Sequence, residues 1–478
     1  MPLILPGNVG SATAATGFNV ANSCRFNPAD SAYMHKTPDA GNRRTFTFSC
    51  WVKRSLISSA QTLFWAGSSN DDYFAMRFEA NNKFSLFEAV SGATNWGINT
   101  NRVFKDISAW YHVVVAVDTR QGTAANRTKI YFNGIQETNL NTGDGYPAEN
   151  RDTIFNTAVP HQIGHDYVAQ YYGGYIAEAC FLEGSQNAPT DFGEFDEDSG
   201  IWKPIDVSGL TFGTNGFYLD FEDSSALGND AAGSNNFTVN NLTAVDQSTD
   251  TCTNNMPTIN QLTLHSNGVT VSEGSLVATT GDAPWQSTNC TFGLTTGKWY
   301  WEFKATESST NQYLVLGIQS DNLLSSAANG FGYSNNYSYG FKNYNGEFVY
   351  NETDGGGSGS YGSAVTDGQI IGVALDLVNL EIYFSINGTF QNSGDPTSGS
   401  SGTGSAGDLQ SGQTYFPSLV IARAGGTGTI PIGEYNFGSP PYSESGGNSD
   451  ADGYGNFAAA PPSGYFSINT KNLAEYGG

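Results

Sequence analysis

The chain has 478 residues, a length that suggests roughly two to four domains, and combines 38% hydrophobic residues with 58 glycines and only 14% charged residues. Such a composition is rich in turn formers and poor in helix formers, which predicts an all-β class. The net charge of −25 argues against nucleic acid and anionic lipid as partners, because both are themselves negatively charged.

Residues 1–19 are predicted to form an N-terminal arm, and a first domain is predicted over residues 20–190. Strand-length segments with period-two alternation follow one another at intervals of about ten residues, which is typical of an antiparallel sandwich. The pair Asn133-Gly134 predicts a tight two-residue hairpin, because both residues tolerate positive φ. The segments are 46–53, 62–67, 73–78, 83–87, 110–118, 129–134, 161–164 and 174–181.

Four short motifs in this domain occur in the order seen in one known family. They are Trp-Tyr-His-Val at 110–113, Tyr-Phe-Asn-Gly at 131–134, Ile-Gly at 163–164 and Tyr-Ile-Ala-Glu at 175–178. This order resembles the laminin-G-like, concanavalin A-like jelly-roll family. The resemblance implies a lectin-like sandwich that binds carbohydrate or protein.

A loop-rich connector is predicted over residues 191–259, and it begins with an acidic cluster at 191–199. Glu194, Asp196 and Asp198 alternate, as carboxylates do in glucanases of this fold, where a retaining pair stands about 5 Å apart. The glucanase motif closes with a second Glu, however, where this chain has Asp198 or Ser199. The flanks are also rich in turn residues, which favours a solvated turn.

Later parts of the connector resemble a joiner found in tailed-phage virion proteins. The resemblance is carried by Gly-Phe-Tyr-Leu-Asp-Phe at 216–221, Leu-Gly-Asn-Asp at 227–230 and Phe-Thr-Val-Asn-Asn-Leu at 237–242. The tail, residues 441–478, contains Tyr-Phe-Ser-Ile-Asn-Thr-Lys-Asn-Leu at 465–473, which is similar to the ending of phage proteins that carry a SPRY domain.

A second domain, residues 260–440, resembles the SPRY domain, which is another concanavalin A-like sandwich. The resemblance is carried by Gly-Lys-Trp-Tyr-Trp-Glu at 297–302, by the strand 367–376, by Phe384 with Asn387-Gly388, and by Phe416-Pro417. Asp367-Gly368 stands where the family usually has Gly-Asp, and Phe416-Pro417 replaces Tyr-Pro. Strand, turn, strand and Asn-Gly predict an antiparallel meander. The resemblance implies a binding module without catalysis.

Candidate site residues fall in two groups. Tyr333, Tyr337, Tyr344 and Asn336 lie in a segment rich in Tyr, Asn, Ser and Gly, a mixture that binding loops use, so we predict a ligand contact there. Asp71, Asp72 and Asp166 could hold Ca²⁺ through carboxylate oxygens, as laminin-G relatives do, although surface turns explain Asp71 and Asp72 equally well. No other cofactor is expected.

The expected architecture is therefore all-β, with two concanavalin A-like jelly-roll sandwiches joined by a connector. The resemblances favour a non-enzymatic virion surface protein of a tailed phage, a tail fibre or receptor-binding appendage that attaches to a host surface glycan or receptor. The alternative is a structural virion component, such as a capsid decoration or head fibre, that binds neighbouring virion proteins. We expect the chain to form a homo-oligomer in the particle and to have no nucleic acid partner.

The N-terminal segment and the apolar runs bear on localisation, and the cysteine spacing bears on burial. Met1 to Gly7 lacks a basic residue and has too short an apolar run for a signal peptide, and no run of about 18 apolar residues occurs. We therefore expect synthesis in the host cytoplasm without a signal peptide and no membrane insertion. The resemblance to phage virion proteins implies a final place on the exposed virion surface. The five cysteines include no Cys-x-x-Cys pair and are expected to be buried.

Overall fold

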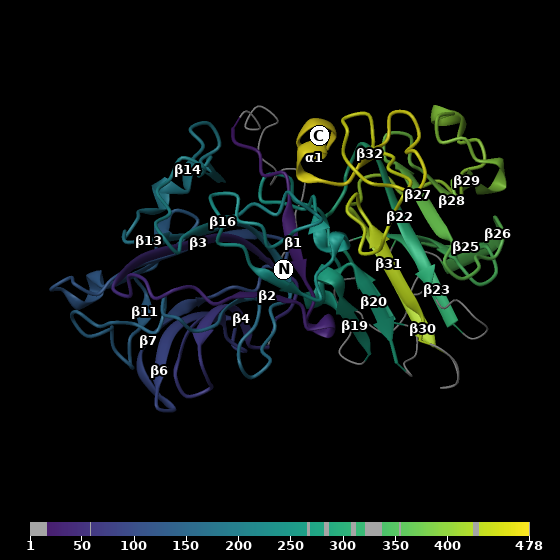
Figure 1. The fold of residues 1–478 in the computed structure, drawn as a ribbon. Coiled ribbons are helices and arrows are strands. Elements are labelled where there is room, and N and C mark those ends of the chain that lie inside the picture. The colour runs from purple at the N-terminus through teal and green to yellow at the C-terminus, as the bar shows by residue number, and fades with distance from the viewer. Residues whose placement is uncertain are drawn as a thin grey trace. The chain divides into compact units, whose positions relative to one another are not determined.

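The computed structural model describes residues 17–57, 59–264, 268–281, 286–306, 312–320, 337–352, 355–423 and 430–477 (Figure 1). They form two compact units, a first unit that ends at Asn254 and a second unit that begins at Asn255. Antiparallel strands make up most of both units, which confirms the predicted all-β class. Among the described residues, no helix is both long enough and apolar enough to span a membrane.

The first unit contains two large sheets. We call the first of them the covered sheet, with strands in the order β10 (Ile135–Gln136), β9 (Thr128–Phe132), β8 (Trp110–Asp118), β3 (Thr45–Arg54), β13 (Gly174–Glu183), β1 (Ser23–Phe26) and β18 (Gln247–Ser248), and with β16 (Phe217–Leu219) also paired with β13. We call the second the open sheet, with the order β11 (Leu140–Asn141), β7 (Ala93–Val103), β6 (Lys83–Val90), β5 (Tyr73–Phe78), β4 (Gln61–Gly67), β12 (His161–Ile163), β2 (Tyr33–Lys36) and β17 (Thr238–Asn240). Short 3-10 turns lie at Pro28–Asp30, Ala124–Asn126, Pro189–Asp191 and Ala244–Asp246.

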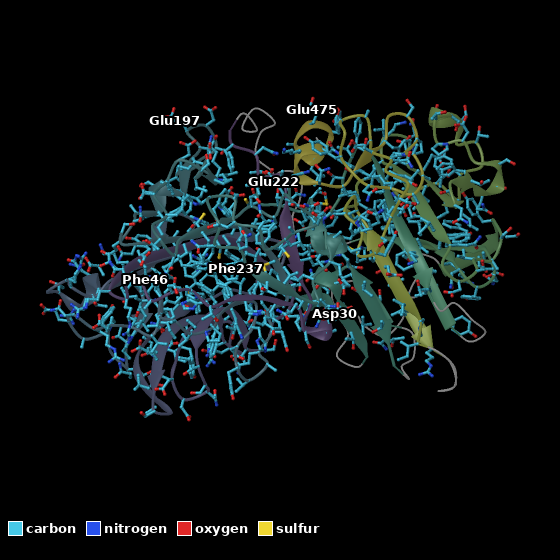
Figure 2. All side chains as sticks on the ribbon, in the orientation of Figure 1. Asp30, Phe46, Glu197, Glu222, Phe237 and Glu475 are labelled. Atoms are coloured by element: carbon cyan, nitrogen blue, oxygen red, sulfur yellow. The ribbon has the colours of Figure 1, made fainter. Side chains whose placement is uncertain are left out.

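The core of the first unit lies between these two sheets. Alternation along each strand decides which side chains enter it: in β5, Phe74 and Met76 are buried in the core, whereas Tyr73 and Arg77 point to the other face. Phe46 from the covered sheet stacks on Phe155 with ring centroids 4.6 Å apart. Figure 2 labels Phe46 and Phe237, which both belong to this aromatic core.

The outer face of the covered sheet is itself buried by the segment that follows β13. The hairpin of β14 (Gly193–Phe195) and β15 (Trp202–Pro204) places Trp202 over this face, where its Nε1 donates to His112 Nδ1 at 3.0 Å. A second apolar cluster joins Val114, Cys180 and Phe212 there. The outer face of the open sheet is covered in part: Trp65 is only 2% exposed beneath Tyr73 and Tyr167, whereas Tyr73 and Phe87 are half-buried.

The predicted domain boundary at residue 190 therefore needs correction. Residues 191–254 were expected to be a connector, but β16 pairs with β13, β17 pairs with β2, and β18 pairs with β1. These strands supply backbone hydrogen bonds and apolar cover that the sandwich needs. The sequence did not reveal this because each strand is only two or three residues long, too short for a periodic signal.

The second unit is also built from two sheets. One has the order β19 (Val269–Ser272), β20 (Val277–Thr280), β31 (Ile432–Asn436), β22 (Lys298–Thr306), β27 (Ile370–Asp376), β28 (Glu381–Ile386) and β29 (Thr389–Phe390), with β32 (Phe466–Ser467) parallel to β22. The other has the order β21 (Gln286–Asn289), β30 (Tyr415–Arg423), β23 (Gln312–Ser320), β24 (Ser338–Lys342), β25 (Glu347–Glu352) and β26 (Gly355–Ser360). The 3-10 turns are Gln261–Thr263, Glu273–Ser275, Gln391–Ser393 and Gly399–Ser401, and α1 (Thr470–Tyr476) is an α-helix.

The tail predicted from residue 441 onward is part of this second unit. Buried Glu302 in β22 accepts hydrogen bonds from the backbone nitrogens of Ala458 and Ala459 at 2.8 and 2.9 Å. Asp450 accepts from Ser467 and from the Asn472 amide, which fixes the start of α1. The tail is thus hydrogen-bonded to buried carboxylates of the second unit.

Both predicted Asn-Gly hairpins are confirmed. Asn133 and Gly134 have φ of 48° and 78°, and Asn387 and Gly388 have φ of 47° and 78°. The flanking residues pair directly, Phe132 with Ile135 and Ile386 with Thr389, so each loop has two residues. Positive φ at both positions is the geometry for which this residue pair is favoured.

Candidate functional site

The outer face of the open sheet is the best candidate for a binding site in the first unit. Directly paired residues share one face of a sheet, so the strand register identifies the side chains in each row. One row crosses seven strands without a break: Thr238, His35, Gln162, Trp65, Ala75, Phe87 and Gly97. Large flat side chains alternate in this row with small or polar ones.

Aromatic rings form a continuous surface around Trp65. Its ring stacks on Tyr73 and on Tyr167, with centroid distances of 6.3 and 6.5 Å. Phe87 meets Tyr73 edge to face at 5.7 Å, and the Arg77 guanidinium lies 4.7 Å from the Phe87 ring centroid. Tyr167 is 60% exposed, so part of this aromatic surface is open to a ligand.

A second aromatic group continues on the side of β2. The rings of Tyr33 and His165 lie tilted against each other with centroids 4.7 Å apart, and those of His165 and Tyr171 with centroids 4.4 Å apart. His165 Nδ1 is 2.8 Å from Gln162 Oε1, and burial lowers the pKa of His165. His165 thus presents a mostly neutral ring beside Tyr33 and Tyr171.

A polar hollow of about 430 Å³ adjoins the aromatic surface on the same sheet. Ser85 and Asn99 lie two residues from Phe87 and Gly97 along their strands and therefore on the same face. Ser85 Oγ donates to Asn99 Oδ1. Within the described part of the chain, the Lys83 ammonium and the Asn99 side-chain nitrogen donate no hydrogen bond. The hollow is lined by Glu79, Ala80, Asn81, Lys83, Ser85, Asn99 and Asn141.

The sequence analysis did not single out this face. Its residues come from seven strands spread over about two hundred positions, and no local motif joins them. Alternation along each strand could have predicted which side chains face away from the core, such as Tyr73 and Arg77 in one strand and Ser85 and Phe87 in the next. The strand order was needed to bring them together.

The three carboxylates considered for calcium are separated. Asp166 accepts hydrogen bonds from the backbone nitrogens of Val168 and Gln170 and from Thr62 Oγ1, near the first residue of β4. Asp71 and Asp72 follow Gly67 at the other end of β4, which is about 16 Å away at 3.3 Å per residue. No group of three His, Cys, Asp or Glu side chains arranged for a metal ion occurs among the described residues.

The predicted tyrosine contacts of the second unit are also separated. Tyr337 precedes β24 and Tyr344 follows it, so the five residues of the strand place them more than about 13 Å apart. Tyr344 is half-buried and meets Tyr313 edge to face at 4.6 Å. Tyr333 and Asn336 lie outside the described residues. Tyr337 and Tyr344 therefore lie at opposite ends of β24.

The acidic alternation at 194–198 lies on the β14–β15 hairpin: Glu194 is in β14, paired with Lys203, whereas Asp196 and Asp198 are in the turn that follows. Lys203 Nζ lies 3.1 Å from Asp196 and 3.4 Å from Glu194. Hydrogen bonds from Ser199 and Lys203 lower the pKa of Asp196 to about 2, whereas a general acid needs a raised pKa. Glu197, labelled in Figure 2, is exposed in the same turn. This geometry agrees with the solvated turn rather than with a retaining pair.

One buried Ser–His pair was not anticipated. Ser49 Oγ is 2.8 Å from His112 Nε2, while His112 Nδ1 accepts from Trp202. Because Nδ1 is an acceptor, the neutral ring carries its proton on Nε2, and it cannot take a proton from Ser49. Burial also lowers the pKa of His112 to about 3. This pair is therefore not arranged for nucleophilic catalysis.

Comparison with known proteins agrees with both domain assignments. Residues 29–187 match the family model described as the concanavalin A-like lectin/glucanases superfamily, and residues 298–404 match the SPRY domain. A search among curated proteins gives no match.

Three solved structures illustrate the likeness in fold. The SPRY domain of human HERC1 is 14% identical over 37% of this chain and 96% of its own, with a TM-score of 0.28. A putative carbohydrate binding protein from Bacteroides ovatus is 16% identical over 47% of this chain and 59% of its own, with a TM-score of 0.32. Domains LG4-5 of the mouse laminin alpha1 chain are 9% identical over 87% of this chain and 89% of their own, with a TM-score of 0.30.

The domain assignments rest on the two family models and on the sandwich topology of each unit. The domains resemble binding folds rather than catalytic ones. The chain carries a laminin-G-like, concanavalin A-like domain followed by a SPRY domain.

Proposed function

We propose that this chain is a non-enzymatic surface protein of a phage virion, a tail fibre or receptor-binding appendage, that attaches the particle to host glycans. The virion context is supported by the resemblance of 216–242 and of the tail to phage virion proteins. The attachment site is the outer face of the open sheet. The single observation that carries this choice is a partly exposed aromatic surface, with Tyr167 over Trp65 and with Tyr73 and Phe87 beside them, that adjoins a polar hollow.

The chemistry of this face suits a sugar. A pyranose ring has apolar C–H faces that pack on aromatic rings, and Tyr167, Tyr73 and Phe87 offer such rings. Its hydroxyl groups need donors and acceptors at fixed positions, which Asn99 and Lys83 supply in the hollow. An uncharged oligosaccharide is the expected ligand, because a protein with net charge −25 repels polyanions.

A shallow face of this kind binds each glycan weakly. Many copies of the chain on one particle would convert weak single contacts into firm attachment through effective concentration. We therefore expect binding to be measurable only when the protein is displayed multivalently.

The test is binding of the full chain, coupled to beads, to host cells and to an oligosaccharide array. Tyr167→Ala removes an exposed stacking ring, and Asn99→Ala removes an amide from the hollow. Each variant should reduce bead retention at least tenfold. Phe195→Ala, an exposed aromatic on the β14–β15 hairpin, is the matched control and should bind like the wild type.

One result would overturn the assignment. If Tyr167→Ala, Asn99→Ala and Phe195→Ala all bind equally well, the open sheet is not the attachment site. In that case we would test whether the second unit supplies the contact. Tyr344→Ala and Tyr337→Ala would be measured separately, because β24 separates the two residues.

A structural role in the particle is the second candidate, either as a capsid decoration or as a head fibre. It is favoured by Phe195 and Ile201, each 49% exposed on the β14–β15 hairpin, because exposed apolar side chains of this size often contact protein partners. Absence of cell binding by every form, together with loss of particle assembly in Phe195→Ala, would favour this role over attachment.

A further inference from the structure

A row of charged residues crosses one sheet of the second unit. Lys298 pairs with Asp376, Asp376 pairs with Glu381, and Glu381 forms an isolated bridge with Asp408. Directly opposite residues share one face, so these four side chains stand side by side. Three carboxylates are thus aligned with a single ammonium group.

The ammonium group neutralises one end of this row. Lys298 Nζ lies 2.7 Å from Asp376 Oδ2, and Asp376 Oδ1 accepts from the backbone nitrogens of Val378 and Asn379. Asp376 therefore already has a full set of partners. Glu381 and Asp408 carry the remaining two negative charges, and like charges placed directly opposite each other destabilise a sheet.

Glu381 is the buried member of this pair. The residue is 7% exposed, and its Oε2 is buried without a hydrogen-bond partner among the described residues. Burial raises the pKa of Glu381, and the nearby Ser405 side chain partly offsets that rise. An unpaired carboxylate in such a position is costly, because it has lost water without gaining a partner. A ligand bound to this oxygen would replace the lost hydrogen bonds.

An oxygen-rich turn is fixed against this carboxylate. Ala406 N donates to Ile382 O at 2.8 Å, and Leu409 N donates to Leu380 O at 2.7 Å, so the turn is anchored on both sides of Glu381. Gly402 has φ of 55°, and a Cβ at this position would collide with Glu381 Oε1. The absence of a side chain at Gly402 lets the turn approach the carboxylate closely.

We propose that a divalent cation, Ca²⁺ in the first place, binds between Glu381 and Asp408. The two carboxylates would supply the charge, and the Ser405 hydroxyl, carbonyl oxygens of the 402–408 turn and water would complete the coordination. Calcium fits because it takes six to eight oxygen ligands in irregular geometry. The ion would neutralise the two charges that Lys298 leaves unpaired.

The test is titration of the full chain with Ca²⁺ by calorimetry and with Tb³⁺ by luminescence, which Tyr383 beside Glu381 can sensitise. Glu381→Gln should lower the number of bound ions by one. Asp408→Asn should weaken the affinity for that ion at least tenfold. Glu347→Gln, a similar change at an exposed carboxylate that pairs with Lys342, should leave both values unchanged. Calcium should also raise the melting temperature of the wild type but not of Glu381→Gln.

The proposal is wrong if Glu381→Gln binds as many ions as the wild type, since any ion then lies elsewhere, for example near Asp71 and Asp72. It is also wrong if the wild type shows no calcium-dependent change while Glu381→Gln is equally stable, which would mean that Glu381 is a protonated, neutral side chain. Asp408 is exposed, so Asp408→Asn should fold even if Glu381→Gln does not. An unchanged affinity in Asp408→Asn would then refute the site.

Discussion

The buried ion pair between Lys53 and Asp250 is expected to hold residues 247–254 in the first unit, and a substitution at Asp250 tests this. Lys53 Nζ lies 2.7 Å from Asp250 Oδ2, and the two side chains are only 1% and 4% exposed. Asp250 Oδ1 also accepts from Trp110 Nε1 at 3.1 Å, and its carbonyl oxygen accepts from Ser23 Oγ at 2.7 Å. Asp250→Asn keeps the shape of the side chain and removes its charge.

The expected loss follows from the burial of Lys53. Removing one partner of a buried pair typically costs about 3–5 kcal/mol, because the other charge stays buried and uncompensated. For a unit of this size such a loss lowers the melting temperature by roughly 6–20 °C. Asp152→Asn is the matched control, since its partner Arg44 is 40% exposed and such surface pairs contribute about 0–1 kcal/mol.

The pH dependence has a defined sign. Burial lowers the pKa of Lys53, and the Asp250 carboxylate opposes that shift. In Asp250→Asn the folded unit therefore binds the Lys53 proton less tightly than the unfolded chain does. The free energy of unfolding should rise with pH from the lowered folded pKa up to the ordinary value of 10.5.

The assay is urea denaturation followed by tryptophan fluorescence, with hydrogen exchange of residues 247–254 as a local readout. We expect faster exchange there in Asp250→Asn and no change in Asp152→Asn. If the two variants differ by less than about 1 kcal/mol, the buried pair does not hold this segment and the reasoning fails.

Three further predictions concern the hairpin glycines, His112 and Glu302. Gly134→Val should cost about 1–3 kcal/mol or more, because φ is +78° and a Cβ would collide with Trp202, whereas Gly388→Val should cost less; melting temperatures of the two variants decide this order. The pKa of His112 is lowered to about 3, so the unfolded chain takes up the proton at a higher pH than the folded chain does. The free energy of unfolding should therefore fall by roughly 2 kcal/mol between pH 7 and pH 5. His112→Gln should flatten this dependence on pH in denaturation curves. Glu302→Gln should destabilise the tail by about 1–3 kcal/mol and expose residues 441–465 to limited proteolysis; an unchanged cleavage pattern would contradict this.

Much of the architecture follows from local sequence signals. Alternation in segments such as 73–78 and 83–87 predicts half-buried strands, because a strand has a strict period of two. Asn133-Gly134 and Asn387-Gly388 predict two-residue turns from φ preferences alone. The motifs at 110–113 and 297–302 identify both domains, and the family models match the same regions.

The tertiary structure alone decided where functional side chains meet. Gln162, Trp65 and Phe87 share one face only through strand pairing between distant segments. Residues 191–254 bury the outer face of one sheet, whereas the other keeps a partly exposed aromatic surface. Tyr337 and Tyr344 are close in sequence, yet a strand holds them apart. Local periodicity determines which face a side chain joins, but the order of strands is set by packing and backbone hydrogen bonds across the whole unit, which no short stretch of sequence encodes.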